Sequence, residues 1–177
     1  MIEYIKSDLF RYYGKTDIGT MLFAFIKNRV FRFQCILRMC QCKGILKCVG
    51  RFLYFFNKTK RHVTIPRQTK IGYGLYIGHG GPIVVSSSAV IGNNVNLSQF
   101  TTIGSNEGKA ATIGDNVYIG PNVCVVEDVV IGNNVTIGAG SVVTKSIPEN
   151  ATAVGNYAKV INYDNPGRYI KNKWIIK

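Results

Sequence analysis

The chain has 177 residues, of which 46% are hydrophobic, and a formal net charge of +13. This length predicts one domain or slightly more, and the apolar content excludes a disordered tail. The charge is uneven, because residues 1–70 hold fifteen Lys or Arg against three acids (+12), whereas residues 71–177 hold seven against six (+1). We therefore expect a basic segment at 1–62, a nearly neutral domain at 63–162 and a tail at 163–177.

The basic segment is predicted to be helical. Residues 2–13 form a first helix that ends at Gly14, Asp17 caps a second that runs to about Met39, and a third follows Gly44 to about Asn57. Basic residues alternate with aromatic and aliphatic ones, which predicts a helical cap on the next domain. The same mixture supports a further hypothesis, peripheral contact of residues 1–62 with an anionic membrane. Nucleic-acid binding is not favoured, because no recognised motif is present.

The location expected from the sequence is the cytoplasm, extended to the inner face of the membrane if the basic segment binds lipid. The N-terminus lacks the layout of a signal peptide, and the longest charge-free run of the basic segment, Ile18–Ile26, is too short to span a bilayer. The five cysteines include no CxxC pair, so reduced thiols are expected. With two histidines in the chain, no metal site is expected.

From Ile65 onward an aliphatic residue returns every six positions and is often followed by Gly, most regularly from Ile113 to Val143. A period of six fits neither a helix nor a simple alternating strand. It predicts short strands joined by tight turns, wound into a parallel β-helix whose stacked coils bury one core. The repeat is interrupted near residues 86–88 and 105–110, where we expect external loops, the second beside a ligand site.

One histidine lies within the repeat. His79 follows Ile77-Gly78 and precedes Gly80-Gly81-Pro82, so it belongs to a turn or an edge and not to the aliphatic core. An imidazole can act as a general base near neutral pH. The alternative is an ordinary surface histidine.

The stretches at 71–85, 113–120, 137–148 and 153–161 resemble the left-handed β-helix of the hexapeptide-repeat acyltransferases, in particular the serine acetyltransferase-like branch. The resemblance implies acetyl-CoA as donor, a homotrimer with the donor in a groove between neighbouring solenoids, and His79 as the general base. It implies coenzyme contacts at Gly104, Gly120, Pro121, Gly138, Ala139, Thr144, Lys145 and Lys159. Many of these glycines can equally be turn-formers of the coil. We expect acceptor contacts from Tyr76, Asn96, Gln99 and Glu107.

The chain departs from the serine acetyltransferase pattern at the acceptor side. Gly78 and Thr64 stand where that family has Asp, Ala110 stands in the loop that carries its Arg-His pair, and Tyr157 replaces a closing Pro. These departures lead us to predict an O-acetyltransferase that acts on a sugar hydroxyl in bacterial surface-polysaccharide biosynthesis, such as that of capsule, O-antigen or exopolysaccharide. The alternatives are a serine O-acetyltransferase of cysteine biosynthesis, an antibiotic acetyltransferase, and a non-catalytic solenoid scaffold.

Overall fold

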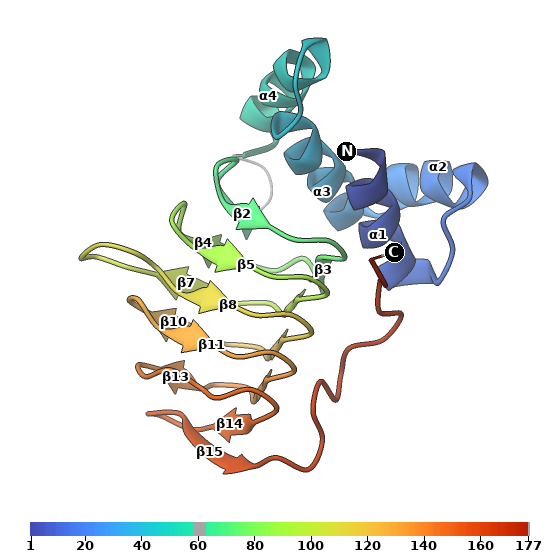
Figure 1. Ribbon diagram of the computed structural model, residues 1–177. Helices are drawn as coiled ribbons and strands as arrows, with labels where there is room; N and C mark the ends of the chain where they lie inside the picture. The colour runs from blue at the N-terminus through green and yellow to red at the C-terminus, as the bar shows by residue number, and fades with distance from the viewer. Residues whose placement is uncertain (59–62, 177) are drawn as a thin grey trace.

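A computed structural model describes residues 1–58 and 63–176, and it confirms the predicted parallel β-helix with a helical N-terminal region (Figure 1). The helices are α1 (Ile2–Tyr13), α2 (Ile18–Lys27), α3 (Arg29–Cys40) and α4 (Ile45–Lys58). The single helix predicted from Asp17 to Met39 is therefore two helices. Asn28 separates them, because its backbone is extended while its side chain caps α3 through the N–H groups of Val30 and Phe31. The predicted boundary at His62 lies outside the described residues.

The solenoid consists of stacked coils, each built from short strands on three faces. The first face holds β1 (Val63–Thr64), β4 (Ile83–Val85), β7 (Thr102–Gly104), β10 (Cys124–Val126) and β13 (Val142–Val143). The second holds β2 (Lys70–Ile71), β5 (Val90–Ile91), β8 (Thr112–Ile113) and β11 (Val130–Ile131). The third holds β3 (Tyr76–Ile77), β6 (Asn96–Leu97), β9 (Tyr118–Ile119), β12 (Thr136–Ile137) and β14 (Thr152–Val154). These strands pair in parallel, and β15 (Lys159–Asn162) closes the third face antiparallel to β14.

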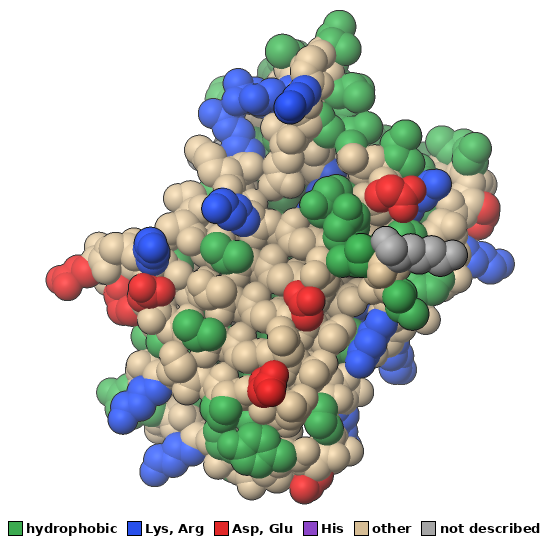
Figure 2. All heavy atoms as spheres, viewed as in Figure 1, with side chains coloured by type: hydrophobic (Ala, Val, Ile, Leu, Met, Phe, Trp, Pro, Cys, Tyr) green, Lys and Arg blue, Asp and Glu red, His purple; other side chains and the backbone are tan. Residues whose placement is uncertain are grey.

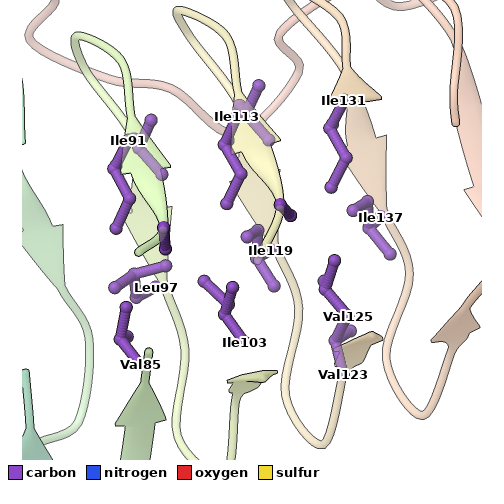
Figure 3. Close-up of a cluster of buried hydrophobic side chains, with 14 of the residues drawn as sticks. Val85, Ile91, Leu97, Ile103, Ile113, Ile119, Val123, Val125, Ile131 and Ile137 are labelled. Atoms are coloured by element: carbon purple, nitrogen blue, oxygen red, sulfur yellow. The ribbon is translucent and has the colours of Figure 1, made fainter. Parts of the chain in front are cut away.

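The core follows the six-residue repeat (Figure 3). Residues of one face stack in register, as Ile91 does on Ile113 and Ile113 on Ile131. These isoleucines are at most 2% exposed, as are Leu97 and Ile119 on the neighbouring face. Full burial of such a side chain stabilises the fold by about 1.5–3 kcal/mol. The interruptions near 86–88 and 105–110 lie between β4 and β5 and between β7 and β8, so both extra segments fall outside the regular strands.

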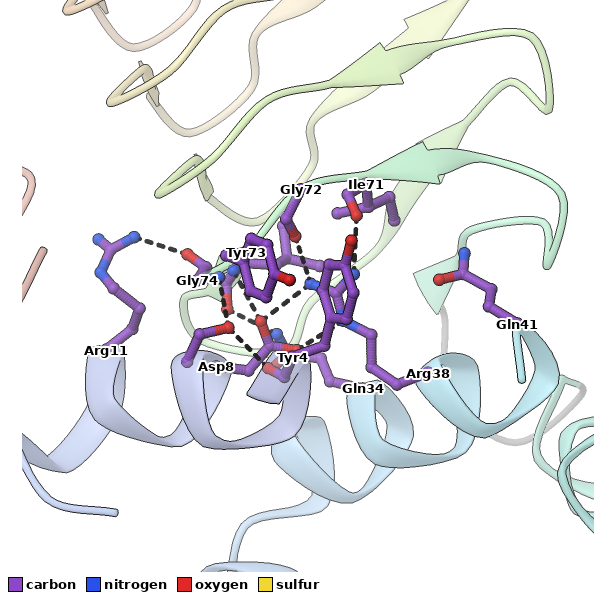
Figure 4. Close-up of polar contacts among 12 residues, drawn as sticks. Tyr4, Asp8, Arg11, Gln34, Arg38, Gln41, Ile71, Gly72, Tyr73 and Gly74 are labelled. Atoms are coloured by element: carbon purple, nitrogen blue, oxygen red, sulfur yellow. Dashed lines mark hydrogen bonds and ion pairs between the residues drawn. The ribbon is translucent and has the colours of Figure 1, made fainter. Parts of the chain in front are cut away.

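Polar side chains of α1 and α3 cover the open edge of the first coil (Figure 4). Arg38 donates both to the Asp8 carboxylate, at 2.9 Å, and to the carbonyls of Ile71 and Gly72. Asp8 in turn accepts a hydrogen bond from the N–H of Leu75 at 2.8 Å. The first coil has no preceding coil to pair with, so its backbone groups need partners from elsewhere. Arg38 is buried for this purpose, whereas the charge pattern alone would place it in solvent.

The C-terminal tail runs back from the last coil to the helices (Figure 1). Its backbone binds side chains on the way, because Asn94 exchanges hydrogen bonds with the backbone of Trp174 and Arg11 donates to the carbonyl of Lys171 at 2.9 Å. The Trp174 ring meets Phe10 of α1 edge-on at 5.8 Å. The tail therefore connects the last coil of the solenoid with the helices that cover the first coil.

Candidate active site at the His79 corner

His79 stands on the corner that joins the third face of the solenoid to the first. Gln99, Pro121 and Ala139 occupy the same place in the next three coils, after β6, β9 and β12. Backbone hydrogen bonds of about 3 Å hold this column together, for example from the Gly78 N–H to the Leu97 carbonyl and from the Gly120 N–H to the Ile137 carbonyl. We call this column of turns the His79 corner.

The backbone of His79 is unlike that of the residues stacked beneath it. Its φ is +49°, in the left-handed region, whereas Gln99, Pro121 and Ala139 avoid positive φ. This region is uncommon for residues other than glycine, and such strain concentrates at functional sites. The following Gly80, at φ +57°, continues the tight turn and donates its N–H to the Gly78 carbonyl. The turn leaves the His79 side chain exposed at the edge of the column.

A hollow of about 150 Å³ lies beside His79. Its lining residues come from the ends of the first three coils on the third face: Tyr76, Gly78, His79, Asn96, Leu97, Ser98, Gln99, Tyr118 and Pro121. The structure thus brings together the predicted base, three of the four predicted acceptor residues and one predicted coenzyme residue. The fourth acceptor residue, Glu107, lies elsewhere.

Gln99 offers an unused acceptor at this hollow. Its Oε1 atom is buried and, with the Thr136 hydroxyl, is one of two buried side-chain polar atoms without a hydrogen-bond partner among the residues that the structure describes. Such an orphan costs about 1–3 kcal/mol unless a ligand or water supplies a donor. Asn96 is already engaged, because its Oδ1 accepts from Arg11 at 2.6 Å and its Nδ2 donates to the Tyr169 carbonyl at 3.2 Å. Of the two amide side chains that line the hollow, Gln99 is therefore the one whose oxygen has no hydrogen-bond partner.

Tyr12 of α1 contacts the strand before His79, which the sequence does not reveal. The Tyr12 hydroxyl lies within donating distance of the Ile77 carbonyl, at 2.9 Å, and of the Gln34 amide oxygen, at 2.7 Å. It accepts a hydrogen bond from the Ile77 N–H at 3.1 Å. Ile77 is two residues before His79. Burial raises the pKa of Tyr12 well above 10, so the phenol stays protonated and keeps its donor. Tyr12 and Ile77 are 65 residues apart, and no local pattern indicates their contact.

The remaining predicted residues form a second group. Gly104 ends β7, and Thr144 and Lys145 directly follow β13, at the corner between the first and second faces. Glu107 lies in the loop at that corner. Lys159 begins β15 at the far end of the solenoid. Within one chain, this group and the His79 corner are on different edges of the prism. Glu107 is exposed there, while the Glu127 carboxylate accepts from Ser105 and Asn106 and holds the loop.

The candidate glycines differ in how much the fold needs them. A Cβ on Gly120 would lie 2.8 Å from the Ile137 carbonyl oxygen, and one on Gly138 would lie 2.6 Å from Val154. Stacking of the coils therefore accounts for both. A Cβ on Gly104 would meet only Thr102, at the ordinary distance of 3.9 Å. Gly104 has no packing reason to be glycine.

No three His, Cys, Asp or Glu side chains gather as a metal site within residues 1–58 and 63–176. The chemistry that the described site offers is that of an imidazole, a free amide oxygen, and the backbone of a corner.

Comparison with known proteins gives a consistent group of relatives. Residues 110–145 match the bacterial transferase hexapeptide family (six repeats). The chain is 42% identical over 107 residues to mitochondrial serine acetyltransferase 3 of Arabidopsis thaliana, and the matched stretch covers 58% of this chain and 27% of the relative. It is 37% identical over 106 residues to the serine acetyltransferase of Helicobacter pylori, covering 58% and 62%. The solved serine acetyltransferase of Neisseria gonorrhoeae, in complex with serine, is 31% identical with a TM-score of 0.72, covering 88% of this chain and 67% of that one.

These relatives correct the predicted acceptor. They are serine acetyltransferases, so the prediction of a sugar hydroxyl in surface-polysaccharide biosynthesis is wrong, and the serine alternative is the better one. The sugar acceptor was predicted because Gly78, Thr64 and Ala110 lack the charged groups of the serine acetyltransferase pattern. Neutral groups such as a Gln amide can also bind polar ligands, so the absence of those charges does not exclude serine. The chain spans less than two thirds of the length of both curated relatives described above.

Proposed function

The chain belongs to the hexapeptide-repeat transferases, in their serine acetyltransferase branch, and from this premise we propose that it transfers an acetyl group from acetyl-CoA to the hydroxyl of serine. One observation carries the proposal: His79 borders a hollow that Gln99 also lines, and the buried Oε1 atom of Gln99 has no hydrogen-bond partner. A base and a ligand-binding amide beside one small cavity suit a small acceptor with a hydroxyl and a second donor group.

In the proposed reaction His79 acts as the general base. Its imidazole takes the proton of the serine hydroxyl while that oxygen attacks the thioester carbonyl of acetyl-CoA. The tetrahedral oxyanion accepts a hydrogen bond from a backbone N–H, and its collapse expels the coenzyme A thiolate, to which His79 returns the proton. The products are O-acetylserine and coenzyme A. A positioned base contributes roughly 100- to 10,000-fold to such a rate.

Gln99 gives the acceptor a reason to bind at this place. The serine ammonium group carries three N–H donors, and the acceptor Gln99 Oε1 has no donor bound to it. Pairing the two satisfies the orphan acceptor and brings the serine hydroxyl to the imidazole of His79, across the same hollow. The ammonium binds a neutral amide in this proposal, whereas the family that the chain resembles has Asp at the positions of Gly78 and Thr64.

We infer further that the enzyme is a homotrimer. The resemblance puts the coenzyme in a groove between two solenoids. In this chain the implied coenzyme residues are divided between the His79 corner, with Gly120, Pro121, Gly138 and Ala139, and the corner of Gly104, Thr144 and Lys145. A neighbouring copy that lays its second corner along the first copy's His79 corner unites the two groups on one coenzyme.

The test is a thiol-release assay with acetyl-CoA and L-serine, with O-acetylserine identified by mass spectrometry. Gln99→Leu should raise the KM for serine by about tenfold, the equivalent of 1.4 kcal/mol, and leave the KM for acetyl-CoA unchanged. Asn165→Leu is the control, because Asn165 is an exposed amide of the C-terminal tail that belongs to neither corner. Absence of serine-dependent thiol release would overturn the proposed function, and an unchanged serine KM in Gln99→Leu would remove Gln99 from the acceptor site.

A further inference from the structure

The outer side of α2 is an unpartnered apolar stripe. Ile18, Leu22, Phe25 and Ile26 follow the spacing of one helix face, and Ile18 and Ile26 are 76% and 64% exposed. Ala24, on the opposite side, is fully buried against the other helices. An apolar helix face normally turns toward a core, whereas this one faces away from it.

The outer side of α4 repeats the arrangement. Ile45, Val49, Phe52 and Phe56 form a stripe on one face, with Ile45 80% and Phe52 65% exposed, and Phe55 lies beside it. On the opposite side, Gly50 lies so close to α3 that a Cβ would come within 2.8 Å of the Cys40 nitrogen. The close contact with α3 fixes which side of α4 is inward and leaves the aromatic side outward.

Both stripes lie at the helical end of the molecule, and basic residues accompany them. Figure 2 shows hydrophobic side chains over α4 and over α2, with Lys and Arg side chains beside them. Residues 14–56 contain eight Lys or Arg and one acid, Asp17. Of the basic residues, Arg38 is buried, whereas Lys27, Lys43 and Arg51 are exposed. Exposed apolar side chains within a basic rim are the combination that binds an anionic lipid surface.

We propose that this surface, the outer faces of α2 and α4 with their basic rim, docks the protein peripherally on an anionic membrane. None of the helices within the described residues has the length and apolar character to cross a bilayer. The Phe, Leu and Ile side chains enter the boundary between headgroups and acyl chains, while Lys27 and Lys43 meet the headgroup phosphates. This property goes beyond the proposed acetyl transfer and does not depend on it.

Charge complementarity favours a lipid over a second copy of the chain. Face-to-face association of two such surfaces would bring one basic rim against another, and like charges at an interface are unfavourable. An anionic leaflet instead attracts each basic residue near its surface. The attraction depends on the charge of the lipid and is screened by salt, which makes it measurable separately from apolar insertion.

The experiment is sedimentation of the full chain with phosphatidylcholine vesicles that contain 30% phosphatidylglycerol. Binding should be strong at low salt, weak with pure phosphatidylcholine, and reduced at 1 M salt, where the Debye length is about 3 Å. Lys43→Glu should lower the partition coefficient by at least about fivefold, which corresponds to about 1 kcal/mol per basic residue. Lys109→Glu makes the same charge change on an exposed solenoid loop and should have no effect.

Apolar insertion has its own variant pair. Ile26→Ser/Phe52→Ser should lower binding by at least about tenfold, because two exposed apolar side chains no longer enter the lipid. The control is Ile161→Ser/Tyr163→Ser, which changes two residues of comparable exposure at the far end of the solenoid. Both pairs should retain the circular dichroism spectrum of the parent.

Three results would overturn the proposal. The first is no sedimentation with anionic vesicles at low salt, and the second is equal binding by Ile26→Ser/Phe52→Ser and its control. The third is a change of oligomeric mass in Ile26→Ser/Phe52→Ser without lipid, which would assign the surface to a second copy of the chain.

Discussion

Removal of one hydroxyl from α1 should impair catalysis at a distance. The Tyr12 hydroxyl accepts from the Ile77 N–H and lies within hydrogen-bond distance of the Ile77 carbonyl, two residues before His79. Tyr12→Phe keeps the ring and leaves the N–H of Ile77 without this partner. A buried donor without a partner costs about 1–3 kcal/mol, so the free energy of unfolding should fall by that amount. The chain should relieve the loss by shifting the turn that holds His79. Because a 1 Å displacement of a catalytic group costs up to about 100-fold, we expect kcat to fall at least about tenfold.

Tyr54→Phe is the matched control for this prediction. Tyr54 also donates its hydroxyl to a backbone carbonyl of the first coil, that of Ile65 at 2.8 Å, but Ile65 is far along the chain from His79. The control should lose about 0.5–1.5 kcal/mol of stability and keep its kcat. Urea unfolding gives the stability of both variants, and thiol release at saturating substrates gives kcat. If Tyr12→Phe and Tyr54→Phe have the same kcat within twofold, Tyr12 does not position the base.

Three further predictions concern other parts of the molecule. His79→Ala should lower kcat by at least about 100-fold while binding of acetyl-CoA, measured by calorimetry, stays unchanged, because the base acts on the acceptor. Arg38→Met breaks a buried ion pair and should cost about 3–5 kcal/mol, lowering Tm by roughly 6–20 °C, whereas the same change at half-exposed Arg32 should lower it by less than about 3 °C. Gly104→Ala should fold normally and raise the KM for acetyl-CoA. Gly120→Ala should instead lose stability, because its new Cβ meets the Ile137 carbonyl. A stable Gly120→Ala variant, or an unchanged KM in Gly104→Ala, would contradict this assignment.

The solenoid was predictable because its determinants are local and repeated. Every hexad must bury its own aliphatic residue, so residues such as Ile91, Ile113 and Ile131 indicate both the strand and its inward side. The stacking of His79 over Gln99 and Pro121 follows from the same repeat, once the coil length is known. The break at Asn28 was missed, because its capping side chain competes with an otherwise continuous helical pattern.

The contacts that complete the site were not predictable from the sequence. Arg38 and Tyr12 reach backbone groups 33 and 65 residues away, and only the docking of the cap on the first coil determines which groups they meet. Gln99 was expected among the acceptor contacts, but the sequence does not reveal that its amide oxygen is buried and unpaired. The sugar acceptor was predicted from absent charged groups, and comparison with the serine acetyltransferases corrected it.

The same physical requirement connects the cap to the proposed chemistry. A parallel solenoid leaves one edge of backbone groups unpaired at its first coil, and α1 and α3 satisfy that edge through Ser7, Asp8 and Arg38. The edge continues through Ile77 to the turn of His79, so the side chains that stabilise the end of the solenoid also determine the position of the proposed base. The basic residues of the N-terminal segment consequently divide into two kinds. Arg11 and Arg38 are buried and hold the first coil, whereas Lys27 and Lys43 are exposed near the apolar faces of α2 and α4. In this arrangement, a helical region that docks on a membrane would hold the His79 corner at a fixed distance from the lipid surface.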